Sequence, residues 1–138
     1  MFLLDTNVVS ELRKSGTQRL DPKVREWASQ VDANRLFLSA ITIEELEIGV
    51  LRIERRDVAQ GAVLREWLEN QVLRGFEGRV LSIDLAVARR SARLQVPDPR
   101  PARDSLIAAT ALVHQFTLVT RNISDFDHTG VRLLNPWT

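Results

Sequence analysis

The sequence of 138 residues contains no cysteine. This absence excludes disulfide bonds, thiolate catalysis and zinc sites with cysteine ligands, and it suits a reducing compartment. No apolar run approaches the roughly 20 residues that a membrane-spanning helix needs. The first residues include no basic segment, and Asp5 interrupts their apolar stretch, so they do not have the pattern of a signal peptide. We therefore expect a protein of the cytoplasm that has no contact with a membrane.

The sequence also has few lysines and almost no net charge. The formal net charge is +1, and of the 19 basic residues only Lys14 and Lys23 are lysines. Arginine suits phosphate recognition, but a GC-rich genome produces the same bias, so bulk charge neither indicates nor excludes a nucleic-acid partner. With 44% hydrophobic and 27% charged residues, the composition is that of an ordinary globular protein. The length predicts a single domain over residues 1–138.

Short runs of branched apolar residues alternate with longer stretches of helical periodicity, which is typical of βαβ units and a parallel sheet. The pattern predicts strands over residues 2–4, 35–38, 79–82 and 117–120, and an edge strand over 131–134. It predicts helices over residues 8–13, from 22 onward, from 39 or 42 to about 53, and over 57–73, 85–94 and 102–115. We therefore expect an α/β fold with a central, mostly parallel sheet of about five strands.

Two aspartates stand at the ends of predicted strands. Asp5 follows the first strand directly, and Asp125 lies in the polar loop after the fourth. Open parallel sheets bind ligands outside the carboxyl ends of their strands, near the point where the strand order reverses. We therefore expect both acids at one edge of the sheet. For Asp5, the alternative is that the side chain simply caps the short helix that follows it.

Two further acids lie at the starts of predicted helices. Asp104 falls in the first turn of its helix, where the macrodipole alone favours an acid, although small residues such as Ala108 on the same side leave room for a cavity. Glu45 belongs to a cluster with Glu44 and Glu47 and lies next to the apolar face of its helix. An acid bordering the core needs a partner, which is either a cation or a nearby arginine.

Converging carboxylates repel one another unless a cation neutralises them. Oxygen ligands without cysteine, and with only two histidines in the chain, favour Mg²⁺ or Mn²⁺ over zinc. Such an ion polarises a phosphoryl oxygen and activates a bound water. The chain has neither a GxGxxG nor a Walker A motif. The acids therefore predict metal-assisted hydrolysis of phosphoesters.

Four segments recur in the order and spacing of a known family: LLDTNVVSEL at residues 3–12, LSAITIEELEIGV at 38–50, RDSLIAATA at 103–111 and LVTRNISDF at 118–126. Together they cover the chain end to end and resemble PIN-domain ribonucleases of the VapC type, the toxins of toxin–antitoxin pairs. The tail GVRLLNPW at 130–137 resembles one subgroup of these toxins.

The resemblance implies an α/β/α sandwich and an acidic site that binds Mg²⁺ or Mn²⁺. It implies that the ligands are Asp5, Glu45, Asp104 and Asp125, and it selects Glu45 from the cluster of glutamates. It also implies polar side chains that orient the carboxylates or their waters. These are Thr6, Asn7, Thr120 and Asn122.

The resemblance further implies a homodimer and a DNA-binding antitoxin, whose C-terminal segment blocks the toxin. An antitoxin arginine in the acidic pocket would make charge-assisted bonds in place of the metal. The leading hypothesis is therefore a metal-dependent endoribonuclease that cuts RNA and is restrained by an antitoxin. The alternatives are a non-catalytic PIN module that grips RNA or a protein, and a metal-dependent phosphatase or DNA nuclease.

Overall fold

The structure is a computed structural model that describes residues 1–138. Five parallel strands form one sheet in the order β3–β2–β1–β4–β5. Their bounds are β1 (Phe2–Leu4), β2 (Leu36–Ser39), β3 (Val80–Leu81), β4 (Thr117–Val119) and β5 (Leu133–Leu134). From β1 the chain builds the sheet outward first through β2 and β3, and later in the opposite direction through β4 and β5. The strand order therefore reverses between β1 and β4.

Helices cover both faces of the sheet, as an all-parallel sheet requires. Leu4 packs on one face in a core cluster with residues of α1 (Thr6–Leu12) and α3 (Ala40–Arg56). Leu3 points to the other face and packs with residues of α6 (Ala102–His114). The predicted α/β/α sandwich with five strands is thus confirmed.

The remaining helices begin at side chains that cap them. Asp21, Asp57 and Asp84 accept backbone N–H groups at the starts of α2 (Pro22–Ser29), α4 (Val58–Trp67) and α5 (Leu85–Leu94). Ser39 does the same for α3, so the predicted choice between Ser39 and Thr42 falls on Ser39. Short helical turns are η1 (Ala33–Arg35), the π-helical η2 (Leu68–Leu73) and η3 (Ile123–Asp125). No helix has the length and apolar character to cross a membrane.

Differences from the predicted elements are small. The predicted helix over 57–73 is α4 followed by the π-helical turn η2, and α3 extends past residue 53 to Arg56. The edge strand is shortened to Leu133–Leu134. The predicted polar loop after β4 contains η3 and the fully buried Phe126, which packs in the α6 cluster. Tertiary packing around Phe126 thus gives regular structure to a segment whose sequence is mostly polar.

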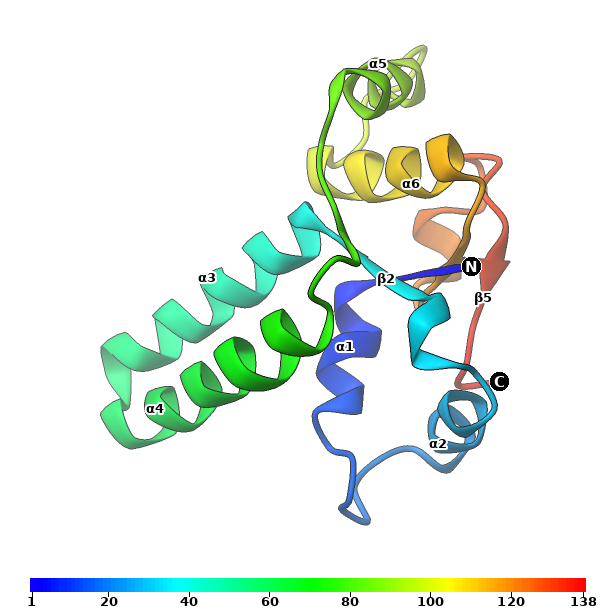
Figure 1. Ribbon diagram of the computed structural model, residues 1–138. Coiled ribbons are helices and arrows are strands. Elements are labelled where there is room, and N and C mark those ends of the chain that lie inside the picture. The colour runs from blue at the N-terminus through cyan, green and yellow to red at the C-terminus, as the bar shows by residue number, and fades with distance from the viewer.

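The helices α3 and α4 form an antiparallel hairpin that projects from the body of the molecule (Figure 1). The two backbones meet at Gly61, where an added Cβ would lie 2.5 Å from the Cα of Glu54. Arg65 of α4 forms ion pairs with Glu47 at 2.5 Å and Glu54 at 2.9 Å, both on α3. The close approach and these charges hold α4 against the helix that carries Glu45.

Candidate active site

The ends of the parallel strands bring the four predicted acids to one edge of the sheet. Asp5 follows β1 and Asp125 ends η3 after β4, so both lie where the strand order reverses. Glu45 lies in the second turn of α3, which follows β2, and Asp104 lies in the first turn of α6. Burial and then the negative charges of the other three acids raise the pKa of Asp104, so each of the three lies near enough to Asp104 to repel its charge.

Asp5 is the most buried of the four acids, with 6% of its surface exposed. Its Oδ1 accepts the backbone N–H of Thr6 at 2.8 Å, and its Oδ2 accepts the hydroxyl of Thr120 at 2.7 Å and the amide of Asn7 at 3.3 Å. Burial raises the pKa of Asp5 against the opposing effect of the Thr120 and Thr6 hydrogen bonds, and repulsion from Glu45 and Asp125 raises the pKa further. Asp5 therefore caps α1 and also belongs to the acidic cluster.

Of the two partners that the sequence left open for Glu45, the structure shows an arginine, and it adds a threonine hydroxyl. The hydroxyl of Thr6 donates to its Oε1 at 2.6 Å. A guanidinium nitrogen of Arg103 lies 3.7 Å from its Oε2, but the Arg103 side chain is 52% exposed. An ion pair this long and this exposed is weak, because solvent screens it. The hydrogen bond from Thr6 is thus the stronger constraint on the Glu45 carboxylate.

Asp104 and Asp125 have neither a salt bridge nor a side-chain hydrogen bond. Burial, followed by repulsion from Asp5, Asp125 and Glu45, raises the pKa of Asp104. Asp125 is exposed to solvent. No three acidic or histidine side chains lie close enough together to hold a metal ion as the structure places them, so the four acids form a loose cluster. Carboxylates without cationic partners are the ligand set that a hard divalent cation fits.

The predicted polar neighbours form a chain of hydrogen bonds behind Asp5. The backbone N–H of Asn122 donates to the Thr120 hydroxyl at 3.0 Å, and that hydroxyl donates its own proton to Asp5. The Thr120 hydroxyl therefore accepts one hydrogen bond and donates another. Asn122 contributes through its backbone, whereas Thr6, Asn7 and Thr120 each reach a carboxylate with a side chain.

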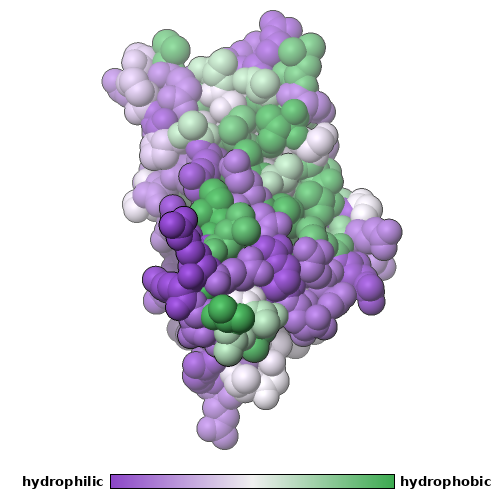
Figure 2. Space-filling view, turned by 90° about the vertical axis from the view of Figure 1, so that its left-hand side faces the viewer, coloured by the Kyte–Doolittle hydropathy of each residue, from purple (hydrophilic) through white to green (hydrophobic).

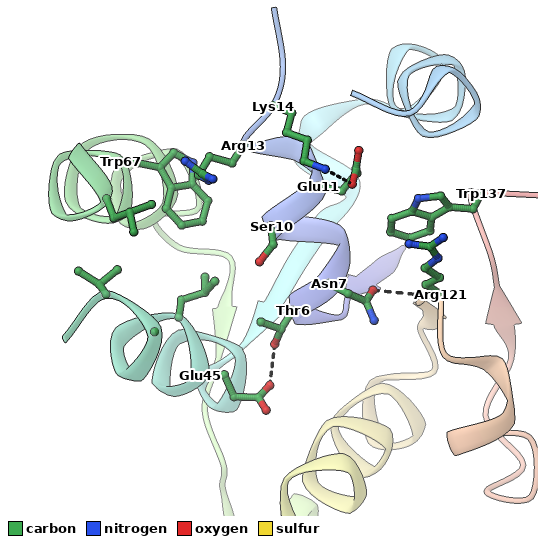
Figure 3. Close-up of a pocket in the computed structure, with 14 residues that line it drawn as sticks. Thr6, Asn7, Ser10, Glu11, Arg13, Lys14, Glu45, Trp67, Arg121 and Trp137 are labelled. Carbon is green, nitrogen blue, oxygen red and sulfur yellow. Dashed lines mark hydrogen bonds and ion pairs between the residues drawn. The ribbon is translucent and has the colours of Figure 1, made fainter. Parts of the chain in front are cut away.

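Two cavities adjoin the acids. The larger has a volume of about 560 Å³, and its lining includes Thr6, Asn7, Glu45, Trp67, Arg121 and Trp137 (Figure 3). The smaller has a volume of about 170 Å³, and Asp104 and Asp125 line it together with Arg100 and His128. Glu45 thus lines one cavity, and Asp104 and Asp125 line the other.

Sequence reasoning missed several residues of the larger cavity. The apolar helical spacing of Trp67 predicts a position in the core or in an interface, and the residue packs against the core and also lines the cavity. Arg121 and Trp137 received no individual role. Two features of the sequence could have indicated a role for these residues. Arg121 directly follows Thr120 at the end of β4, and Trp137 lies in the tail segment that resembles one subgroup of the toxins.

The fold and the site together define a parallel α/β domain with an acidic centre at the switch point of its sheet. The PIN domain model matches residues 2–131, and the chain belongs to this family. It is 37% identical over 145 residues to the VapC ribonuclease Y4jK of Sinorhizobium fredii, which covers 99% of this chain and 98% of that protein.

Two further comparisons point to the same family. The chain is 37% identical over 143 residues to the toxin FitB of Neisseria gonorrhoeae, covering 99% of each protein. A solved structure of FitAB bound to an IR36 DNA fragment contains a similar chain, with a TM-score of 0.87 and 34% identity, covering 100% of this chain and 96% of that one.

Proposed function

We propose that this protein is a metal-dependent endoribonuclease and the toxin of a toxin–antitoxin pair. The observation that carries the proposal is the convergence of Asp5, Glu45, Asp104 and Asp125 at the switch point of a PIN-domain sheet. The similarity to proteins named as a VapC ribonuclease and as a toxin supports it along nearly the whole chain. We regard residues 1–138 as one catalytic domain that acts in the cytoplasm.

We assign the four acids as ligands of Mg²⁺ or Mn²⁺. Three of them, Asp5, Asp104 and Asp125, form no salt bridge, and burial together with repulsion between the acids raises the pKa of Asp5 and Asp104. A bound divalent cation would polarise a phosphoryl oxygen and lower the pKa of a water. The hydrogen bonds of Thr120 and Thr6 hold the carboxylates of Asp5 and Glu45 in orientation before any ion binds.

The central experiment is cleavage of single-stranded RNA by the purified protein with Mg²⁺ or Mn²⁺, with and without EDTA. We expect cleavage that requires the ion and falls at least about 100-fold in Asp5→Asn. Asp98→Asn, which removes an equal charge from an exposed aspartate outside both cavities, is the matched control and keeps full activity. Cleavage in EDTA, or a fully active Asp5→Asn protein, would contradict the proposed mechanism.

The alternative functions are separated by two further measurements. If the acids are metal ligands, calorimetric titration with Mn²⁺ should detect binding, and Asp104→Asn should weaken it. A non-catalytic module should bind RNA but no ion at this site. A panel of RNA, DNA and phosphate monoesters distinguishes a ribonuclease from a phosphatase or a DNA nuclease, because the same carboxylates suit all three reactions.

We also propose an antitoxin partner and a homodimer. The related toxin FitB and the DNA-bound FitAB structure support the antitoxin. Figure 2 faces the side from which the α3–α4 hairpin projects, and hydrophobic side chains gather there in patches among hydrophilic ones. Large apolar side chains on α3 to α5, including Leu51, Val63 and Leu85, are 53%, 58% and 75% exposed. Exposed apolar patches mark association surfaces, so sedimentation equilibrium should give twice the chain mass.

A further inference from the structure

In the lining of the larger cavity beside the acids, the guanidinium of an arginine lies over the ring of a tryptophan (Figure 3). The Cζ of Arg121 lies 5.1 Å from the ring centroid of Trp137. Arg121 directly follows Thr120, the hydroxyl donor to Asp5, and its backbone N–H donates to the side chain of Asn7 at 3.3 Å. The pair is thus tied to the same strand end as the carboxylates.

The charges in this cavity leave two guanidinium groups without carboxylate partners. Lys14 is neutralised by Glu11 at 3.1 Å, and Glu45 is engaged by Thr6. Arg13 and Arg121 also line the cavity, and both side chains are exposed and form no salt bridge. Two guanidinium groups in the lining of this cavity are therefore free to bind an anionic ligand, and arginine recognises phosphate with the same planar fork that it uses for carboxylates.

Trp137 is a fixed support for Arg121. Its ring is half-buried and packs against the core cluster that contains Leu4. Its backbone N–H donates to Oδ1 of Asn135 at 2.9 Å, which closes a tight turn at the end of the chain. A guanidinium held over an indole by a cation–π interaction keeps one flat face and its N–H edge toward solvent. A flat face and a donor edge are what nucleotide recognition by arginine uses.

We propose that Arg121, supported by Trp137, binds one nucleotide of a single-stranded RNA next to the bond that the acids cleave. The base stacks on the free face of the guanidinium, and a neighbouring phosphate accepts its N–H groups. Paired bases in a duplex offer no free face, so the subsite favours unpaired RNA. The proposal rests on the proposed function and adds the residues that grip the substrate. Arg121 contacts substrate directly, and Trp137 is a positioning residue.

Steady-state cleavage of single-stranded RNA tests the subsite. We expect Arg121→Gln to raise the KM about tenfold and to leave kcat within about twofold, because the contact is made equally in the ground and transition states. Arg121→Lys keeps the charge without the plane and recovers only part of the loss. Trp137→Leu behaves like Arg121→Gln, whereas Trp137→Phe, which retains a ring, stays near the unmodified protein. Arg89→Gln, an equal charge change on an exposed part of α5, is the control.

Binding of a fluorescein-labelled single-stranded RNA in an Asp104→Asn background gives a second readout. Each phosphate contact contributes about 0.7 to the slope of log Kd against log salt concentration for single strands, so Arg121→Gln lowers the slope by that amount and Arg89→Gln leaves it unchanged. Unchanged KM and slope in Arg121→Gln would overturn the subsite, even if the protein cleaves RNA. The subsite would also be overturned if Arg121→Gln weakened only the binding of a co-expressed protein partner and left RNA binding unchanged.

The two proposals fail separately. One outcome is that the protein cleaves RNA with neither Mg²⁺ nor Mn²⁺ but binds RNA with a salt slope that depends on Arg121. That outcome would refute the ribonuclease activity and support the subsite. Metal-dependent cleavage with a KM independent of Arg121 and Trp137 would support the ribonuclease and refute the subsite.

Discussion

Replacing Gly61 with alanine should destabilise the protein, although alanine is the better helix former. A Cβ at this position would lie 2.5 Å from the Cα and 3.0 Å from the backbone nitrogen of Glu54. These are backbone atoms, so no side-chain rotation relieves the overlap. We expect α4 to move away from α3, which lengthens the ion pairs of Arg65 with Glu47 and Glu54 and shifts the wall of the larger cavity that contains Trp67.

The magnitude follows from two opposing effects. Overpacking costs about 1–3 kcal/mol, and an overlap with backbone atoms that cannot rotate away belongs to the upper part of this range, about 2–3 kcal/mol. The higher helix propensity of alanine returns about 1 kcal/mol. We therefore expect a net loss of roughly 1–2 kcal/mol for Gly61→Ala. Gly49 is a matched control, because it also lies within a helix but an added Cβ meets nothing within 4 Å. Gly49→Ala should raise stability by about 1 kcal/mol.

Urea unfolding followed by circular dichroism measures both variants against the unmodified protein. The two substitutions should change the midpoint in opposite directions at an unchanged m value, with a separation of about 2–3 kcal/mol between them. For a chain of this size, a loss of 1 kcal/mol corresponds to a fall in Tm of about 3–6 °C. Equal or greater stability of Gly61→Ala would refute the close approach of the two helices, and destabilisation of Gly49→Ala would refute the use of helix propensity.

Three further predictions concern the site. Asp104→Asn should abolish cleavage and stabilise the metal-free protein at neutral pH. The pKa of Asp104 is raised in the folded state, so the unmodified protein loses stability as the pH rises from the ordinary pKa of 3.8 through the folded-state pKa. Urea unfolding at a series of pH values should therefore show the stability gain of Asp104→Asn at neutral pH and no gain below pH 3.8. Thr120→Val removes a hydrogen bond that lowers the pKa of Asp5, so the acidic limb of the pH–rate profile should move to higher pH. Phe126→Ala should lower the free energy of unfolding, measured in urea, by about 3–5 kcal/mol, because the Phe126 side chain is only 1% exposed. The same substitution should loosen the turn that positions Asp125. A loss under about 1 kcal/mol would contradict the packing of Phe126.

Much of the fold was predictable because its signals are local. The strand Phe2–Leu4 and the helix Leu85–Leu94 have the predicted bounds, since apolar periodicity and a capping aspartate act over a few residues. The π-helical turn over Leu68–Leu73 and the 3₁₀ turn around the buried Phe126 were not predicted. Turns of this kind depend on packing against distant elements, which local propensity does not describe.

The sequence by itself determined which acids lie at the ends of strands and helices, and parallel pairing then brings such ends to one edge. Only the tertiary structure decided how these acids are held. Thr120 reaches Asp5 across 115 positions because β1 and β4 pair with Leu4 opposite Val119, and Thr6 reaches Glu45 across 39 positions. The same packing seats Arg121 on Trp137. Strand register and side-chain packing are properties of the whole fold, so no local pattern contains them.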